Sequence, residues 1–135
     1  MLKRGRYVSV ALDDVTPAPV KAEEGWRGMD MRFLIGSQLG VENVCVFRAV
    51  FAPGAAHEKH LHPDADEFSF VVRGRALLGV DDEEQVVSAG NARFIPAGRV
   101  HWLRQLDGEE VEVVGAYLGV GSLEEAGYEF VGHVE

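Results

Sequence analysis

The pattern of hydrophobic and polar positions predicts strands along most of this chain. Residues 43–51, "NVCVFRAVF", form an apolar run of β-branched and aromatic residues that is typical of a strand. Residues 67–73 and 100–106 alternate between polar and apolar side chains, so successive side chains would project to opposite faces of a sheet. Similar but shorter patterns predict further strands at residues 7–12, 31–36, 75–80, 85–90, 92–98 and 111–120.

Turn-forming residues separate these predicted strands. The chain holds 16 glycines and 5 prolines, which favours many short elements over long helices. Pro53 and Gly54 are expected to end the strand at 43–51, and residues 13–30 are expected to form an irregular arm. One short helical turn is predicted at 122–127, where Ser122 would cap the turn with Glu125 three residues on. The pattern as a whole predicts an antiparallel sandwich or barrel.

Size and charge limit the classes of partner. A chain of 135 residues is the size of one domain, and its formal net charge of −9 predicts no nucleic-acid partner, because an acidic surface repels phosphates. No apolar run approaches the roughly 20 residues needed to cross a membrane, and the N-terminus lacks the features of a secretory signal. We therefore expect a cytoplasmic protein without a membrane partner. Cys45 is the single cysteine and is expected to be a buried structural thiol.

The segment "HLHPDADE" carries the candidate chemistry. His60 and His62 are two residues apart on an extended segment, so both would project to the same face. Pro63 and Asp64 favour a turn that could return Glu67 beside them. Two imidazoles and a carboxylate form a reasonable partial ligand set for a divalent transition metal, with His101 as the candidate fourth ligand. On these residues alone, a solvated surface cluster remains the alternative.

Two longer motifs resemble those of the cupin superfamily. Residues 54–74, "GAAHEKHLHPDADEFSFVVRG", are similar to its first motif, G(x)5HxH(x)3–4E(x)6G. Residues 90–105, "GNARFIPAGRVHWLRQ", are similar to its second motif, G(x)5PxG(x)2H(x)3N, except that Gln105 stands where the motif has Asn. The chain is thus identified as a small single-domain cupin. The motif glycines, which are Gly54, Gly74, Gly90 and Gly98, are expected at sharp turns.

The resemblance implies a fold and a metal centre. It implies an all-β protein with an antiparallel jelly-roll β-barrel, formed here by residues 31–121, between an N-terminal arm at 1–30 and a helical turn and tail at 122–135. His60, His62, Glu67 and His101 would bind one divalent transition metal, which could be Mn, Fe, Ni, Co, Cu or Zn. The resemblance also implies a homodimer, formed by packing of sheets or by exchange of a strand at residues 7–12.

The resemblance further implies a small-molecule substrate. The full ligand set favours a metal-dependent enzyme, most simply a dioxygenase-type oxidoreductase with substrate and dioxygen at open metal positions. A redox-neutral isomerase or lyase acting on a sugar or keto acid is the alternative enzyme. A non-catalytic small-molecule-binding protein is the alternative from another class, because one architecture carries many functions.

Four other residues are candidates for the pocket or for support of the ligands. His57 could lie at the pocket mouth or behind a ligand, or it could be a solvated loop residue. Gln105 shares the predicted face of His101 and could line the pocket or lie at the rim. Arg48 and Arg73 could bind a carboxylate substrate from inside the barrel, or they could be ordinary surface residues.

Overall fold

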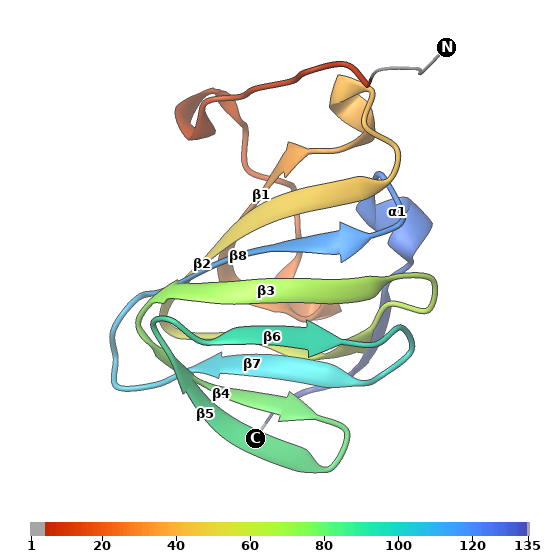
Figure 1. Ribbon diagram of the computed structural model, residues 1–135. Helices are drawn as coiled ribbons and strands as arrows, with labels where there is room; N and C mark the ends of the chain where they lie inside the picture. Colours follow the sequence, from red (N-terminus) through yellow and green to blue (C-terminus); the bar gives the residue numbers. More distant parts are fainter. Residues whose placement is uncertain (1–4, 135) are drawn as a thin grey trace.

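The structure is a computed structural model that describes residues 5–134, and these fold into a curled antiparallel β-sheet (Figure 1). The strands are β1 (Trp26–Ile35), β2 (Val44–Leu61), β3 (Asp66–Arg73), β4 (Arg75–Val80), β5 (Glu83–Ser88), β6 (Ala92–Ile95), β7 (His101–Gln105), β8 (Val111–Leu118) and β9 (Glu129–Gly132). Three 3₁₀ turns lie at Leu12–Asp14, Ala22–Glu24 and Ser37–Leu39. The prediction of an all-β fold is confirmed.

One short helix, α1 (Leu123–Ala126), follows β8. The Ser122 hydroxyl accepts a hydrogen bond from the Glu125 N–H at 3.1 Å, as the capping pattern predicts. Within the described residues, no helix is long and apolar enough to cross a membrane.

Strand β2 belongs to both halves of the fold. Its first half pairs with β1 and β8, and its second half pairs with β7 and β9. The prediction that Pro53 and Gly54 end this strand is wrong, because the chain runs on to Leu61 through a break in register with β1. Gly54 has a φ of 82°, and its N–H donates to Gln105 Oε1 at 2.9 Å. A side chain therefore replaces the missing ladder bond, and the irregularity lets β2 pass from one half to the other.

The two halves enclose the core. The strands β1, β2, β8, β3 and β6 are neighbours in one half, and β5, β4, β7, β2 and β9 are neighbours in the other (Figure 1). Apolar side chains from both halves fill the space between them, among them Phe47, Phe51, Val71, Leu78, Leu103 and Val113. The inner faces of β2, β3 and β7 therefore lie opposite one another across a closed interior.

The ends of the chain differ from the prediction. Strand β1 begins at Trp26, inside the region expected as an arm, because pairing with β2 orders residues that carry no clear strand pattern. No strand forms at residues 7–12 in the single chain, and Leu12–Asp14 are a 3₁₀ turn instead. The expected tail includes β9, which pairs with Lys59–Leu61 of β2. Residues 1–4 of the expected arm and residue 135 lie outside the described residues.

Candidate metal centre

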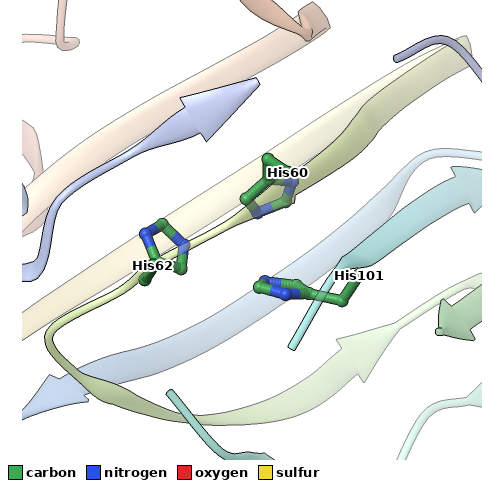
Figure 2. Close-up of side chains that lie close together, drawn as sticks. All are labelled: His60, His62 and His101. Atoms are coloured by element: carbon green, nitrogen blue, oxygen red, sulfur yellow. The ribbon is translucent and has the colours of Figure 1, made fainter. Parts of the chain in front are cut away.

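Three buried histidines converge in the interior of the barrel (Figure 2). His60 on β2 and His101 at the start of β7 are direct partners in the register of the two strands. His62 follows the end of β2 and shares the inward direction of His60. One ring nitrogen from each histidine lies within 4.8 Å of the others, which is close enough for all three to bind one metal ion.

Hydrogen bonds orient all three rings in the same way. The Nδ1 atoms lie 2.6 Å from the Glu58 carbonyl for His60, 2.8 Å from the Gly127 carbonyl for His62 and 2.9 Å from the Arg99 carbonyl for His101. A carbonyl oxygen only accepts, so each Nδ1 carries the proton and each Nε2 keeps its lone pair. All three Nε2 atoms are buried and have no hydrogen-bond partner within residues 5–134. Three unpartnered lone pairs in one place fit a bound cation.

The turn after β2 fixes the direction of His62. The backbone carbonyl of His62 accepts a hydrogen bond from the Gly98 N–H at 2.9 Å. The Asp64 N–H donates to the Ala126 carbonyl at 2.9 Å. Gly127 packs so closely here that an added Cβ would come within 2.7 Å of the Pro63 ring. Gly127, at the end of the helical turn, therefore supplies the carbonyl that orients a candidate ligand.

Glu67 adds a carboxylate beside two of the histidines. Its Oε1 atom lies 3.4 Å from the Nε2 atoms of both His62 and His101. Burial would raise the pKa of the Glu67 carboxyl, but His101, His62 and Arg93 outweigh burial and hold the pKa well below its usual range. Burial and the neighbouring histidines lower the pKa of His60, which keeps that imidazole neutral. The site thus offers three imidazole nitrogens and one carboxylate oxygen, a chemically suitable donor set for a transition metal.

An aromatic stack covers one side of the histidines. The His57 ring lies parallel to the His60 ring at 3.6 Å between centroids, and Trp26 stacks on His57 at 4.1 Å. Tyr128 stacks on Trp26 at 4.9 Å. Trp26 and Tyr128 also line a second cavity of about 810 Å³ between the N-terminal segment and α1. Aromatic rings therefore lie between this outer cavity and the histidines.

The cavity beside the histidines is small. Its volume is about 20 Å³, which is room for one or two water molecules. Apolar core residues form much of its wall, and the lining residues with polar groups are His57, His60, Glu67, Arg93, His101, Trp102 and Tyr117. A polycyclic molecule would require the wall to rearrange, whereas a ligand of a few atoms would require little movement.

Comparison with protein families gives a match to the model described as "Cupin domain" over residues 47–117, which is more than half of the chain. The chain belongs to the cupin family. The matched range contains the three histidines and Glu67, so the resemblance carried by the two sequence motifs is confirmed.

Known cupins with different functions resemble this one. A polyketide synthase, CurC, of Streptomyces cyaneus is 32% identical over 65% of this chain and 58% of its own length. Oxalate oxidase GF-2.8 of Triticum aestivum is 30% identical over 55% of this chain and 37% of its own length. The chain therefore spans less than two thirds of the length of either curated relative.

Solved structures show the same fold. The polyketide cyclase RemF of Streptomyces resistomycificus has a TM-score of 0.75 at 23% identity, over 100% of this chain and 89% of that one. A cupin-like protein of Thermotoga maritima has a TM-score of 0.73 at 24% identity, over 91% of both chains. A structure of oxalate oxidase has a TM-score of 0.69 at 24% identity, over 92% of this chain and 63% of that one.

Two of the residues predicted to support the site in this cupin, His57 and Gln105, are buried but make different contacts. His57 is buried against His60, so the interpretation as a solvated loop residue is wrong. Gln105 is also buried, but its side chain bonds to Gly54, Leu106 and Glu109 and is no part of the cavity wall. Its role is to hold the irregularity in β2.

Neither arginine proposed to lie inside the barrel does so. Arg48 binds Glu112 at 2.6 Å, and Arg73 binds Glu110 and the same Glu112 at 2.6 and 3.1 Å. These side chains lie on the outside of the sheet, because Arg48 has the opposite parity to the buried Phe47 and because Arg73 lies at the end of β3, where it turns outward.

The arginine that does reach the cavity is Arg93 on β6, which the motif-based reasoning missed. It lies opposite Ser69 of β3 and shares the inward parity of the buried Ile95. The alternation within "ARFI" could have revealed it, since Arg93 and Ile95 face one way and Phe94 the other. Phe94 is accordingly 59% exposed.

Proposed function

We propose that this cupin binds one divalent transition metal through His60, His62, Glu67 and His101 and acts as a dioxygenase-type oxidoreductase on a small organic substrate. The observation that carries the proposal is the set of three buried, unpartnered Nε2 atoms whose Nδ1 atoms donate to backbone carbonyls. Leaving a buried polar atom unpaired costs about 1–3 kcal/mol, and a bound cation would remove this cost for all three nitrogens.

A metal in this site would supply open positions for substrate and dioxygen and would stabilise negative charge on a bound oxygen atom. The chain supplies the rest. The three carbonyls hold the imidazoles in the correct tautomer, and Glu67 reduces the positive charge of the site. The apolar wall and the Trp26–His57 stack exclude bulk water from the reacting groups.

The relatives support two enzyme classes. Oxalate oxidase, by its name, oxidises a small acid, and a substrate of that size would require less movement of the cavity wall than a polyketide. CurC and RemF are named for polyketide chemistry, which favours the redox-neutral alternative for a protein of this fold. The small cavity, of about 20 Å³, is the observation that supports the first class over the second.

The metal site is tested by elemental analysis of protein produced in metal-replete medium, together with a His62→Ala variant. We expect the parent to hold close to one equivalent of metal and the variant to lose at least 90% of it, since each missing ligand weakens binding steeply. His133→Ala is the matched control, because His133 is 71% exposed and binds Glu58 rather than the cavity. Equal metal content in the parent and the His62→Ala variant overturns the ligand set.

The reaction type is tested with an oxygen electrode and a panel of small hydroxy acids, keto acids and phenols. Oxygen consumption by the metal-loaded parent, absent from the His62→Ala variant, supports the dioxygenase proposal. Substrate turnover without oxygen consumption supports the redox-neutral alternative. Ligand binding without turnover of any panel member favours a binding protein.

We also propose that the chain forms a homodimer. An apolar patch, here called the outer face, consists of exposed side chains on β3, β6 and β8, which are Phe68, Phe70, Val72, Phe94 and Leu118. Their exposed fractions run from 37% to 59%, which is high for large apolar residues on neighbouring strands. A contiguous patch of this kind is typical of an interface, and packing of two sheets would cover it.

A further inference from the structure

Arg93 is a buried cation that reaches the proposed metal site. It lies in β6 directly opposite Ser69, and 15% of its side chain is exposed. Its Nε donates a hydrogen bond to the Ser69 hydroxyl, which fixes the orientation of the guanidinium. Its Nη2 lies 3.8 Å from Glu67 Oε2, on the side of the carboxylate away from His62 and His101. Glu67 therefore lies between the histidines and the guanidinium.

One donor of this guanidinium has no partner. The Nη1 atom of Arg93 is buried and makes no hydrogen bond within the part of the chain that the structure describes. A buried donor on a charged group needs an acceptor, because desolvation without one is costly. Arg104 also carries an unpartnered buried nitrogen, but it is not part of the cavity wall, whereas Arg93 is. Arg93 therefore combines an unpartnered buried donor with a place on the cavity wall.

The charges around the cavity leave it positive once a metal is present. The negative charge of Glu67 and the positive charge of Arg93 cancel within the interior. A divalent metal would then contribute two positive charges that no described group on the cavity wall offsets. Uncompensated charge is unfavourable in a closed apolar interior, so an anionic ligand beside the metal would be stabilised.

We propose that Arg93 is a specificity-determining residue that binds the carboxylate of a small-acid substrate beside the metal. This inference rests on the proposed metal-dependent function and names its substrate class. A carboxylate oxygen would accept the free Nη1 donor in a charge-assisted hydrogen bond, and its negative charge would offset the metal. The cavity volume of about 20 Å³ restricts the ligand to a few heavy atoms unless the wall moves.

Calorimetric binding of glycolate and glycolamide to the metal-loaded protein tests this role. The two probes match in size but differ in charge, and glycolate chelates too weakly to remove the metal. We expect Arg93→Met to weaken glycolate binding at least tenfold and to leave glycolamide binding unchanged. Arg75→Met is the matched control, because Arg75 is exposed and paired with Asp107 outside the cavity; its glycolate affinity should equal that of the parent.

A purely structural role for Arg93 gives a different result. If Arg93 only holds Glu67 in place, Arg93→Met weakens metal binding and leaves the glycolate affinity of the loaded fraction unchanged, which overturns the inference. Arg93→Lys covers the case in which the methionine variant does not fold. It keeps the charge but loses the planar donor pair, so glycolate should bind several-fold more weakly than to the parent, and an unchanged affinity contradicts the proposal.

The metal content of the parent protein distinguishes a failure of the role of Arg93 from a failure of the proposed function. A parent protein that takes up metal but binds glycolate no better than Arg93→Met refutes the role of Arg93 and leaves the proposed metal site intact. A parent protein that takes up no metal refutes the proposed function, and the role of Arg93 beside the metal fails with it.

Discussion

The two faces of β3 have exchanged the usual roles of polar and apolar residues. The inner face places Glu67 and Ser69 in the interior at 5% and 1% exposure, and the outer face leaves Phe68 and Phe70 at 40% and 37% exposure. An ordinary half-buried strand would bury the phenylalanines, since burial of such a side chain contributes about 1.5–3 kcal/mol. The exchange supports the two roles that we propose for this strand. Its inner face builds the candidate metal centre, and its outer face is proposed to meet a second copy of the chain.

The largest effect that this comparison predicts is on the inner face. In metal-free protein, Glu67→Ala would leave the Arg93 guanidinium buried without its counter-charge. We expect the free energy of unfolding to fall by about 3 kcal/mol, the usual cost of breaking a buried ion pair. Urea denaturation measures this change.

The neighbouring position on the outer face gives the control. Phe68→Ala removes more apolar surface than Glu67→Ala, but the side chain is 40% exposed, so in the monomer we expect a loss under about 1.5 kcal/mol. A larger loss at Phe68 than at Glu67 would show that the outer face of β3 contributes more to stability than the inner face. That result would contradict the roles that we propose for the two faces.

The next effect concerns association through the outer face. Phe94→Asp places a charge at the most exposed position of that face, next to Phe68 in the register of β3 and β6. If two outer faces pack together, the dimer dissociation constant should rise at least tenfold, because an unpaired charge in an apolar interface costs more than about 1.4 kcal/mol. Sedimentation over a range of protein concentrations measures it.

Strand exchange predicts a different outcome for the same measurement. If Phe94→Asp dissociates like the parent while deletion of residues 1–12 abolishes the dimer, then the N-terminal segment forms the interface. A parent that sediments as a monomer at all concentrations contradicts the proposal of a homodimer.

The smallest effect is at the charged edge beside the outer face. Arg48 and Arg73 hold the pKa of Glu112 below its ordinary value of 4.5, with Arg48 contributing most. Since the folded pKa is depressed, this carboxylate stabilises the fold above pH 4.5 and loses its contribution as the pH falls through the folded value. Partial exposure limits the contribution to about 1 kcal/mol.

Glu112→Gln isolates this contribution. The stability of metal-free parent and variant should differ by about 1 kcal/mol at pH 7 and should converge as the pH falls toward 3, as followed by urea denaturation. A difference that persists unchanged at pH 3 would mean that the interaction does not depend on the charge of the carboxylate.

Much of the fold and the candidate ligands could be predicted from the sequence because both depend on local spacing. Alternation fixes which side chains share a face, so His60 with His62 and Glu67 with Ser69 follow from the chain alone. The motif glycines were also predictable, and Gly54, Gly74, Gly90 and Gly98 all have positive φ. Ser122 and Glu125 sufficed to place the helical turn, because a cap is a contact within one turn.

Contacts between distant segments could not be predicted in the same way. Gly127 orients His62 through a backbone carbonyl, a group that every residue carries and that no sequence pattern marks. Gln105 supports Gly54 across 51 positions, and with that support β2 continues through a Pro-Gly pair that local rules treat as a stop. The burial of His57 and Arg93 could not be predicted, because it depends on which strands become neighbours.

The sequence by itself determined the period of each strand, the turns and the spacing of the candidate ligands, because these are properties of neighbouring residues. Tertiary structure decided which face of β3 points inward, which arginine enters the cavity and which carbonyl orients each imidazole. The physical reason is that alternation defines two faces without assigning either to the interior. That assignment is made when β2, β7 and β8 pair and close the barrel, which buries the polar face of β3 around a site and leaves the apolar face outside.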